Sequence, residues 1–140
     1  MEFAGMNLRA VLVAAIASFL FGGVWYSLFS RQWRAAADIE ETHSSRSEWH
    51  VNAMPFIVAF IGLLVMAYVL AGVIGHLGPG QVTVRNGIIS GAFIWVGFVM
   101  TTLVTNNVFR RANRTMTLID GGHWLGVLVL QGAVIGWFGT

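Results

Sequence analysis

The chain alternates between long apolar stretches and shorter polar segments. The apolar stretches cover residues 10–30, 53–75, 87–105 and 118–139. Each holds about 19 to 23 residues, so as an α-helix it would extend about 28 to 35 Å and cross a hydrocarbon core of about 30 Å. Only helices and closed barrels satisfy their backbone groups in lipid, and unbroken apolar runs favour helices. The pattern predicts an all-α fold, an integral membrane four-helix transmembrane bundle.

The polar segments carry boundary signals. Pro55 stands where the second helix should begin, a position that tolerates its missing N–H. Gly78-Pro79-Gly80 predicts a turn between the second and third helices. The alanine-rich residues 32–41 are expected either to continue the first helix or to lie along the membrane surface. We interpret residues 1–140 as a single transmembrane domain whose first apolar run, longer than a signal-peptide core, is an uncleaved span.

Composition supports this assignment. Hydrophobic residues make up 56% of the chain and charged residues 10%, whereas soluble domains carry about 25% charged residues. So few charges could not cover a water-exposed surface of this size. Cysteine is absent, which excludes disulfides, thiolate metal sites and cysteine nucleophiles.

The basic residues predict an orientation. Lysine is absent, and the eight arginines are too scattered for the dense basic stripe that nucleic acid requires, so no nucleic-acid partner is predicted. Six arginines lie in the first and third polar segments, against two in the N-terminal and second segments. The positive-inside rule then predicts that loops 31–52 and 106–117 are cytoplasmic and that both termini lie outside.

Most of the chain resembles a known family, and the likeness is strongest at the first and last helices. The end of the first helix and both ends of the last one carry the likeness, in Gly22-Gly23-Val24-Trp25-Tyr26-Ser27-Leu28-Phe29 with Gln32-Trp33, in Thr117-Leu118-Ile119-Asp120-Gly121-Gly122-His123-Trp124, and in Gly132-Ala133-Val134-Ile135-Gly136-Trp137. These residues resemble the small bacterial membrane family catalogued as domain of unknown function 1761. The resemblance implies a compact four-helix membrane protein, expected in a bacterial inner membrane as a multi-pass protein. It implies no activity, cofactor or catalytic residue.

Small residues recur at four-residue steps on every predicted helix. They are Ala14, Ser18 and Gly22; Ala67, Ala71 and Gly75; Gly87 and Gly91; and Gly122 and Gly126 with Gly132 and Gly136. Such stripes allow close packing where lipid supplies no hydrophobic drive, and Gln131 is expected to hydrogen-bond between helices. The stripes either seal the helices of one protomer together, or one of them, with the fourth helix as first candidate, joins copies of the chain. We predict a homo-oligomer surrounded by membrane lipid.

Polar residues from three predicted helices should meet at one depth. Asp120 is the only acidic residue in an apolar stretch, and His123 lies three residues later on nearly the same face. Tyr26 ends the first helix on the same side, as Thr105 and Asn106 end the third. An ionisable residue inside a span is a functional hypothesis by default, and a carboxylate beside an imidazole could bind and release a proton.

Two interpretations of this group stay open. In one, Asp120 is the N-cap of the fourth helix, and the protein is structural or partner-binding. In the other, Asp120, His123, Tyr26 and the Thr105–Asn106 pair line a path for protons, ions or a small solute in an oligomeric channel or transporter. One Asp and one His do not complete a zinc site, and a phosphate-binding loop would need a lysine. We therefore predict no metal, no cofactor and no enzymatic activity.

Overall fold

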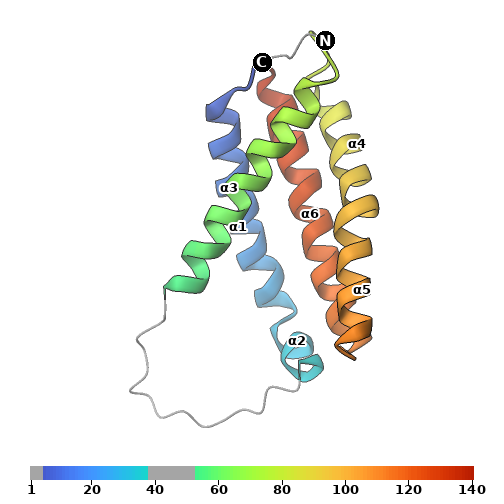
Figure 1. Ribbon diagram of the computed structural model, residues 1–140. Coiled ribbons are helices and arrows are strands. Elements are labelled where there is room, and N and C mark those ends of the chain that lie inside the picture. Colours follow the sequence, from blue (N-terminus) through green and yellow to red (C-terminus); the bar gives the residue numbers. More distant parts are fainter. Residues whose placement is uncertain (1–4, 38–52) are drawn as a thin grey trace.

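The computed structural model describes residues 5–37 and 53–140, where all regular structure is helical. The segments are α1 (Leu8–Leu28), α2 (Ser30–Ala36), α3 (Met54–Gly75), α4 (Val84–Ile94), the π-helical η1 (Trp95–Met100), α5 (Thr101–Phe109) and α6 (Arg114–Phe138). α4, η1 and α5 continue into one another as a single span (Figure 1). In this part of the chain, four helices are long and apolar enough to cross a membrane. The predicted all-α membrane bundle is confirmed.

Polar caps, not the apolar runs, set where three of the helices begin. Asn7 accepts hydrogen bonds from the N–H groups that open α1, Thr83 does so for α4, and Asn113 does so for α6. The predicted starts at residues 10, 87 and 118 were therefore two to four residues late. The third span also runs beyond residue 105, to Phe109.

Two other boundary signals were interpreted correctly. Pro55 lies in the first turn of α3, and the turn into α4 contains Gly78 and Gly80 at positive φ, 102° and 74°. The expectation that the alanine-rich segment continues the first helix was wrong, because α1 stops at Leu28 and α2 follows as a separate short helix that ends at Ala36. Residues 38–52 of the first polar segment lie outside the described residues; they include Asp38, Glu40, Glu41, His43, Arg46, Glu48 and His50.

α6 is the central helix. It packs against α4 on one side and α1 on the other, while α3 crosses obliquely and packs mainly on α1 (Figure 1). The start of α1, the α3–α4 turn and the end of α6 lie at one end of the bundle, called here the terminal end. α2 and the α5–α6 turn lie at the opposite end, called the α2 end.

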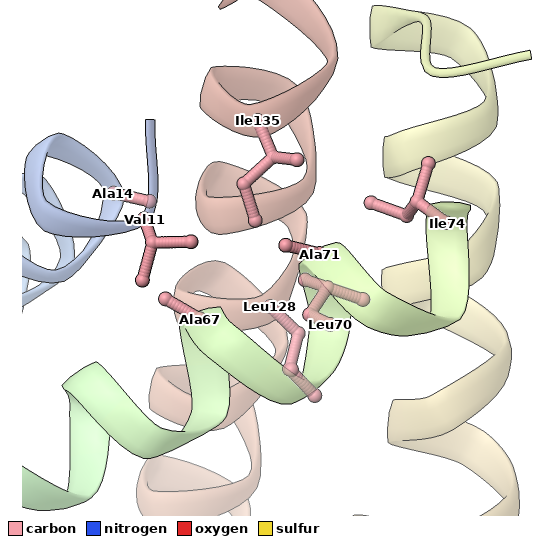
Figure 2. Packing of buried hydrophobic residues seen from close by; sticks show 8 residues of the cluster. All are labelled: Val11, Ala14, Ala67, Leu70, Ala71, Ile74, Leu128 and Ile135. Carbon is pink, nitrogen blue, oxygen red and sulfur yellow. The ribbon is translucent and has the colours of Figure 1, made fainter. Parts of the chain in front are cut away.

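A hydrophobic cluster fills the half of the bundle nearer the terminal end. Figure 2 shows its eight members where the second half of α3 crosses α1 and α6: Val11, Ala14, Ala67, Leu70, Ala71, Ile74, Leu128 and Ile135. Leu70 and Ile74 are almost completely buried, at 1% and 0% exposure. This half of the bundle is closed by apolar side chains.

Glycines hold α4 and α6 in backbone contact. A Cβ built on Gly87 would overlap the Gly132 carbonyl, and one on Gly132 would overlap the Gly87 carbonyl. Gly136 meets the Thr83 carbonyl in the same way. Gly132 and Gly136 of α6 thus pack against a helix of their own chain. A homo-oligomer would have to use a different surface.

We expect Gly132→Ala to destabilise the bundle by about 1–3 kcal/mol, because the new methyl group meets backbone that cannot rotate away. Unfolding by sodium dodecyl sulfate in mixed micelles measures the change. Gly62→Ala on α3 is the matched control, since a Cβ there has no atom within 4 Å. Equal stabilities of the two variants would contradict the backbone contact.

Candidate functional site

Asp120 lies inside α6 and is not its cap. The helix begins at Arg114 with Asn113 as N-cap, which places Asp120 in the second turn, about 9 Å along the axis from Arg114. The hypothesis that Asp120 caps the fourth helix was wrong, because Asn113 supplies that hydrogen bond about two turns earlier. The carboxylate therefore needs partners from other helices.

Those partners come from α1 and α2. The Tyr26 hydroxyl donates to Asp120 Oδ1 at 2.7 Å, and the Trp33 indole N–H donates to the same oxygen at 3.0 Å. Hydrogen bonds to a carboxylate are stronger than those between neutral groups. α2 is a seven-residue helix that shows no side-chain cap bond of its own, and the bond from Trp33 ties it to α6.

Two further tryptophans bind the backbone on either side of Asp120. The Trp25 indole donates to the Ile119 carbonyl at 3.0 Å, and the Trp95 indole, from η1, donates to the Gly121 carbonyl at 2.8 Å. A carbonyl oxygen has two lone pairs, so each can accept an indole bond in addition to its helical bond. Three indoles from three different segments therefore converge on three consecutive residues of α6.

Glycines make room for this convergence. A Cβ on Gly122 would lie 2.8 Å from the Trp25 ring, and one on Gly121 would lie 2.9 Å from the Met100 sulfur. A Cβ on Gly126 would likewise overlap the Phe21 ring. Gly122 and Gly126, predicted as a packing stripe, thus receive aromatic rings of α1 rather than a second copy of the chain.

His123 is enclosed by aromatic rings. Its ring centroid lies 4.8 Å from that of Tyr26 and 6.1 Å from that of Phe21, with which it is nearly parallel. A Cβ on Gly22 would lie 2.9 Å from His123 Nε2, so Gly22 provides the space for the imidazole. His123 is only 7% exposed, and its Nδ1 is buried without a hydrogen-bond partner.

Thr105 and Asn106 do not join this group. Both side chains are exposed on α5, whereas the next residue, Asn107, is buried and donates to the Thr117 hydroxyl at 2.9 Å. Met100 and Leu103, which face Gly121, precede Asn107 by seven and four residues, so all three lie on one stripe of the helix. That spacing identifies Asn107 as the inward residue. The prediction that Thr105 and Asn106 belong to the polar group was wrong, because both side chains are exposed and Asn107 faces inward.

Gln131 joins three helices at the centre of the bundle. Its Nε2 donates to the Ser18 hydroxyl and to the Leu63 carbonyl, both at 3.0 Å, and the side chain is completely buried. Its Oε1 has no hydrogen-bond partner. The position matches the expectation of a residue that hydrogen-bonds between helices.

A cavity of about 780 Å³ opens beside the Asp120 group. It is bordered by α1, α2, α3 and α6, and its lining residues are Phe19, Gly22, Gly23, Tyr26, Ser27, Ser30, Arg34, Phe56, Ala59, Leu63, His123 and Trp124. Tyr26 and His123 therefore face both the cavity and the hydrogen-bond group around Asp120. In the described part of the chain, no three His, Cys, Asp or Glu side chains are grouped so that they could hold a metal ion.

A family model described as protein of unknown function (DUF1761) matches residues 9–136. The chain belongs to this family. The DUF1761 match covers all the residues quoted for the resemblance except Trp137, and it includes the tryptophans and glycines around Asp120. No curated protein and no solved structure was found to match the chain.

In this DUF1761 chain, a double-mutant cycle should reveal the bond between Tyr26 and Asp120. We expect Tyr26→Phe and Asp120→Ala to be coupled by about 1–3 kcal/mol, because Asp120→Ala leaves the Tyr26 hydroxyl without its acceptor and Tyr26→Phe removes one of the two donors to Asp120 Oδ1 in a part-buried site. Unfolding in mixed micelles gives the four stabilities.

The chain's second tyrosine provides the control for this cycle. Tyr68 is 49% exposed, and Tyr68→Phe should change the stability by less than about 0.5 kcal/mol and show no coupling to Asp120→Ala. Additive effects of Tyr26→Phe and Asp120→Ala would show that the bond contributes nothing to stability.

Proposed function

We propose that the protein is a non-enzymatic, partner-binding membrane protein whose cavity at the α2 end takes up a small molecule from the bilayer. The cavity itself is the observation that carries this proposal. Its volume of about 780 Å³ falls within the range of about 300–1,000 Å³ found for small-molecule sites. Its walls are largely apolar, with a few polar groups at one side, as such sites usually are.

The position of α3 supports entry from the lipid. The first half of this helix starts apart from α1 and approaches it only on the way to the terminal end (Figure 1). Met54, Phe56, Ile57 and Val58 on this half are all more than half exposed, as expected for side chains that face acyl chains. A molecule dissolved in the membrane can therefore reach the cavity without crossing water.

The closed half of the bundle favours binding over transport. The cavity reaches Phe19 and Leu63, and the Leu63 carbonyl is already bound by Gln131. Beyond this level the hydrophobic cluster of Figure 2 fills the space between α1, α3 and α6. A path for ions or protons through one protomer would have to cross that cluster.

The bonds from the three tryptophans have a structural role in this proposal. They fix α1, α2 and η1 to one turn of α6 and so form the rigid wall of the cavity. A homo-oligomer remains a prediction, with the lipid-facing side of α4, η1 and α5 as an available surface, where Phe93 and Phe98 are 76% and 73% exposed.

Cavity binding can be tested by filling the space. Gly23 lines the cavity, and a Cβ there has no atom within 4 Å, so Gly23→Leu should fold normally and occupy the site. We expect photolabelling by a diazirine derivative of hexadecanol in liposomes, mapped to peptides from α1 and α3, to fall about fivefold, because the leucine excludes the chain. Gly62→Leu, on α3 and equally unobstructed, should label like the wild type.

Labelling that is the same in all three proteins would contradict cavity binding. Transport would be supported instead if proteoliposomes conducted protons and Asp120→Asn abolished that flux. Under the binding proposal, Asp120→Asn changes stability and leaves the proton permeability of the liposomes unchanged.

We propose that the protein lies in the inner membrane of a bacterial cell, with the α2 end on the cytoplasmic side. Five described arginines, Arg31, Arg34, Arg110, Arg111 and Arg114, lie at the α2 end, whereas Arg9 and Arg85 lie at the terminal end. This distribution supports an orientation in which both termini lie outside.

Because the chain has no cysteine, single cysteines report this orientation directly. We expect Pro79→Cys, in the α3–α4 turn, to react with a membrane-impermeant maleimide added to intact cells after outer-membrane permeabilisation. Ala112→Cys, in the α5–α6 turn, should react only after the inner membrane is opened. The reverse pattern would overturn the proposed orientation.

A further inference from the structure

We infer that the partner taken up by this cavity is an amphiphile with an anionic head group, bound at that head by Arg34. This inference rests on the proposed function and specifies its ligand. The amphiphile's chain would lie against α1 and α3, and its head would lie at the membrane surface beside α2.

The polarity of the lining changes along the cavity in the way an amphiphile requires. The lining residues of α1 run from Phe19 to Ser27, about 12 Å along the helix axis. At the deep end the cavity is bordered by Phe19 and Leu63, and at the α2 end by Ser30 and Arg34. A chain in the apolar part and a head at the α2 end would match the direction of the surrounding lipid leaflet.

Among the described residues, the charge at the α2 end of the cavity is positive. Arg34 lines it, and within the described residues the only acidic side chain, Asp120, does not. Asp120 Oδ1 is already bound by Tyr26 and Trp33, the residue next to Arg34. A guanidinium next to a low-dielectric cavity attracts a carboxylate or phosphate and can bind it through two parallel hydrogen bonds.

The hydroxyl groups of the lining are already used as donors. Tyr26 donates to Asp120, Ser27 donates to the Gly23 carbonyl at 2.6 Å, and Ser30 donates to the Ser27 carbonyl at 3.3 Å. Among the described residues that line the cavity, the Arg34 guanidinium thus offers the largest set of donors still available. An anionic head group would bind these donors more strongly than a neutral one, so the site should select for charge.

The test compares two photoreactive probes that differ only in charge at the head, diazirine palmitate and diazirine hexadecanol, in liposomes at a pH where the fatty acid is ionised. The wild-type protein should be labelled roughly tenfold more strongly by palmitate than by hexadecanol, from the energy of a charge-assisted contact. Arg34→Gln should lower palmitate labelling to the hexadecanol level and leave hexadecanol labelling unchanged. Retained hexadecanol labelling also shows that the variant is folded.

Arg31→Gln is the matched control. Arg31 lies on the same helix and is exposed like Arg34, but it does not line the cavity, so its loss should leave the preference for palmitate intact. Competition separates the possible sources of the anion: unlabelled palmitate or lysophosphatidate should displace the probe, whereas acetate and inorganic phosphate should not.

Equal labelling by both probes, or a preference that survives Arg34→Gln, would overturn the anionic head group while leaving cavity binding intact. Displacement by acetate or phosphate would also overturn it, since the site would then bind a small anion. The absence of labelling by either probe in the wild type would reject the proposed function itself.

Discussion

Close approach to the backbone of α6 is the constraint on which this bundle depends. Lipid gives apolar helices no hydrophobic reason to associate, so contacts between helices must come from dense packing and hydrogen bonds. On the side of α4, Gly132 and Gly136 permit direct backbone contact. On the side of α1, Gly122 and Gly126 admit the rings of Trp25 and Phe21. One helix with glycines on two faces therefore organises the other spans, and α3 is left to pack chiefly on α1.

The oblique path of α3 divides the bundle into a closed half and an open half. Its second half completes the hydrophobic cluster, in which Leu70 and Ile74 are almost fully buried. Its first half diverges, and the space it leaves is the cavity lined by Leu63, Ala59 and Phe56. Gln131 lies near the division, where its side chain binds both Ser18 and the Leu63 carbonyl. The oblique crossing of α3 therefore accounts both for the hydrophobic cluster and for the cavity.

The sequence predicted the spans because length and hydropathy alone decide whether a helix can cross a membrane. It also placed Asp120, His123 and Tyr26 at one depth, since depth follows from helix rise and the alternation of spans. It could not predict which neighbours turn inward, because that depends on the rotation of each helix. Asn107 rather than Asn106 faces α6. The indole of Trp33 reaches Asp120 from α2, a separate helix that begins after α1 has ended. Asn is a residue type that often caps helices, so the cap at Asn113 was predictable. The start of the last helix was placed too late because it was set at the start of the apolar run.

The donors around Asp120 explain how a carboxylate can be kept within a span with no arginine partner among the described residues. Tyr26 and Trp33 both donate to one of its oxygens, which offsets part of the cost of removing the charge from water. Because these donors are neutral, Asp120 need not compete for Arg34, whose charge stays available at the cavity. An ion pair between the two residues would also link α2 to α6 but would neutralise the charge of Arg34 at the cavity. The choice of aromatic donors over a salt bridge is thus consistent with a site that binds an anion from the membrane.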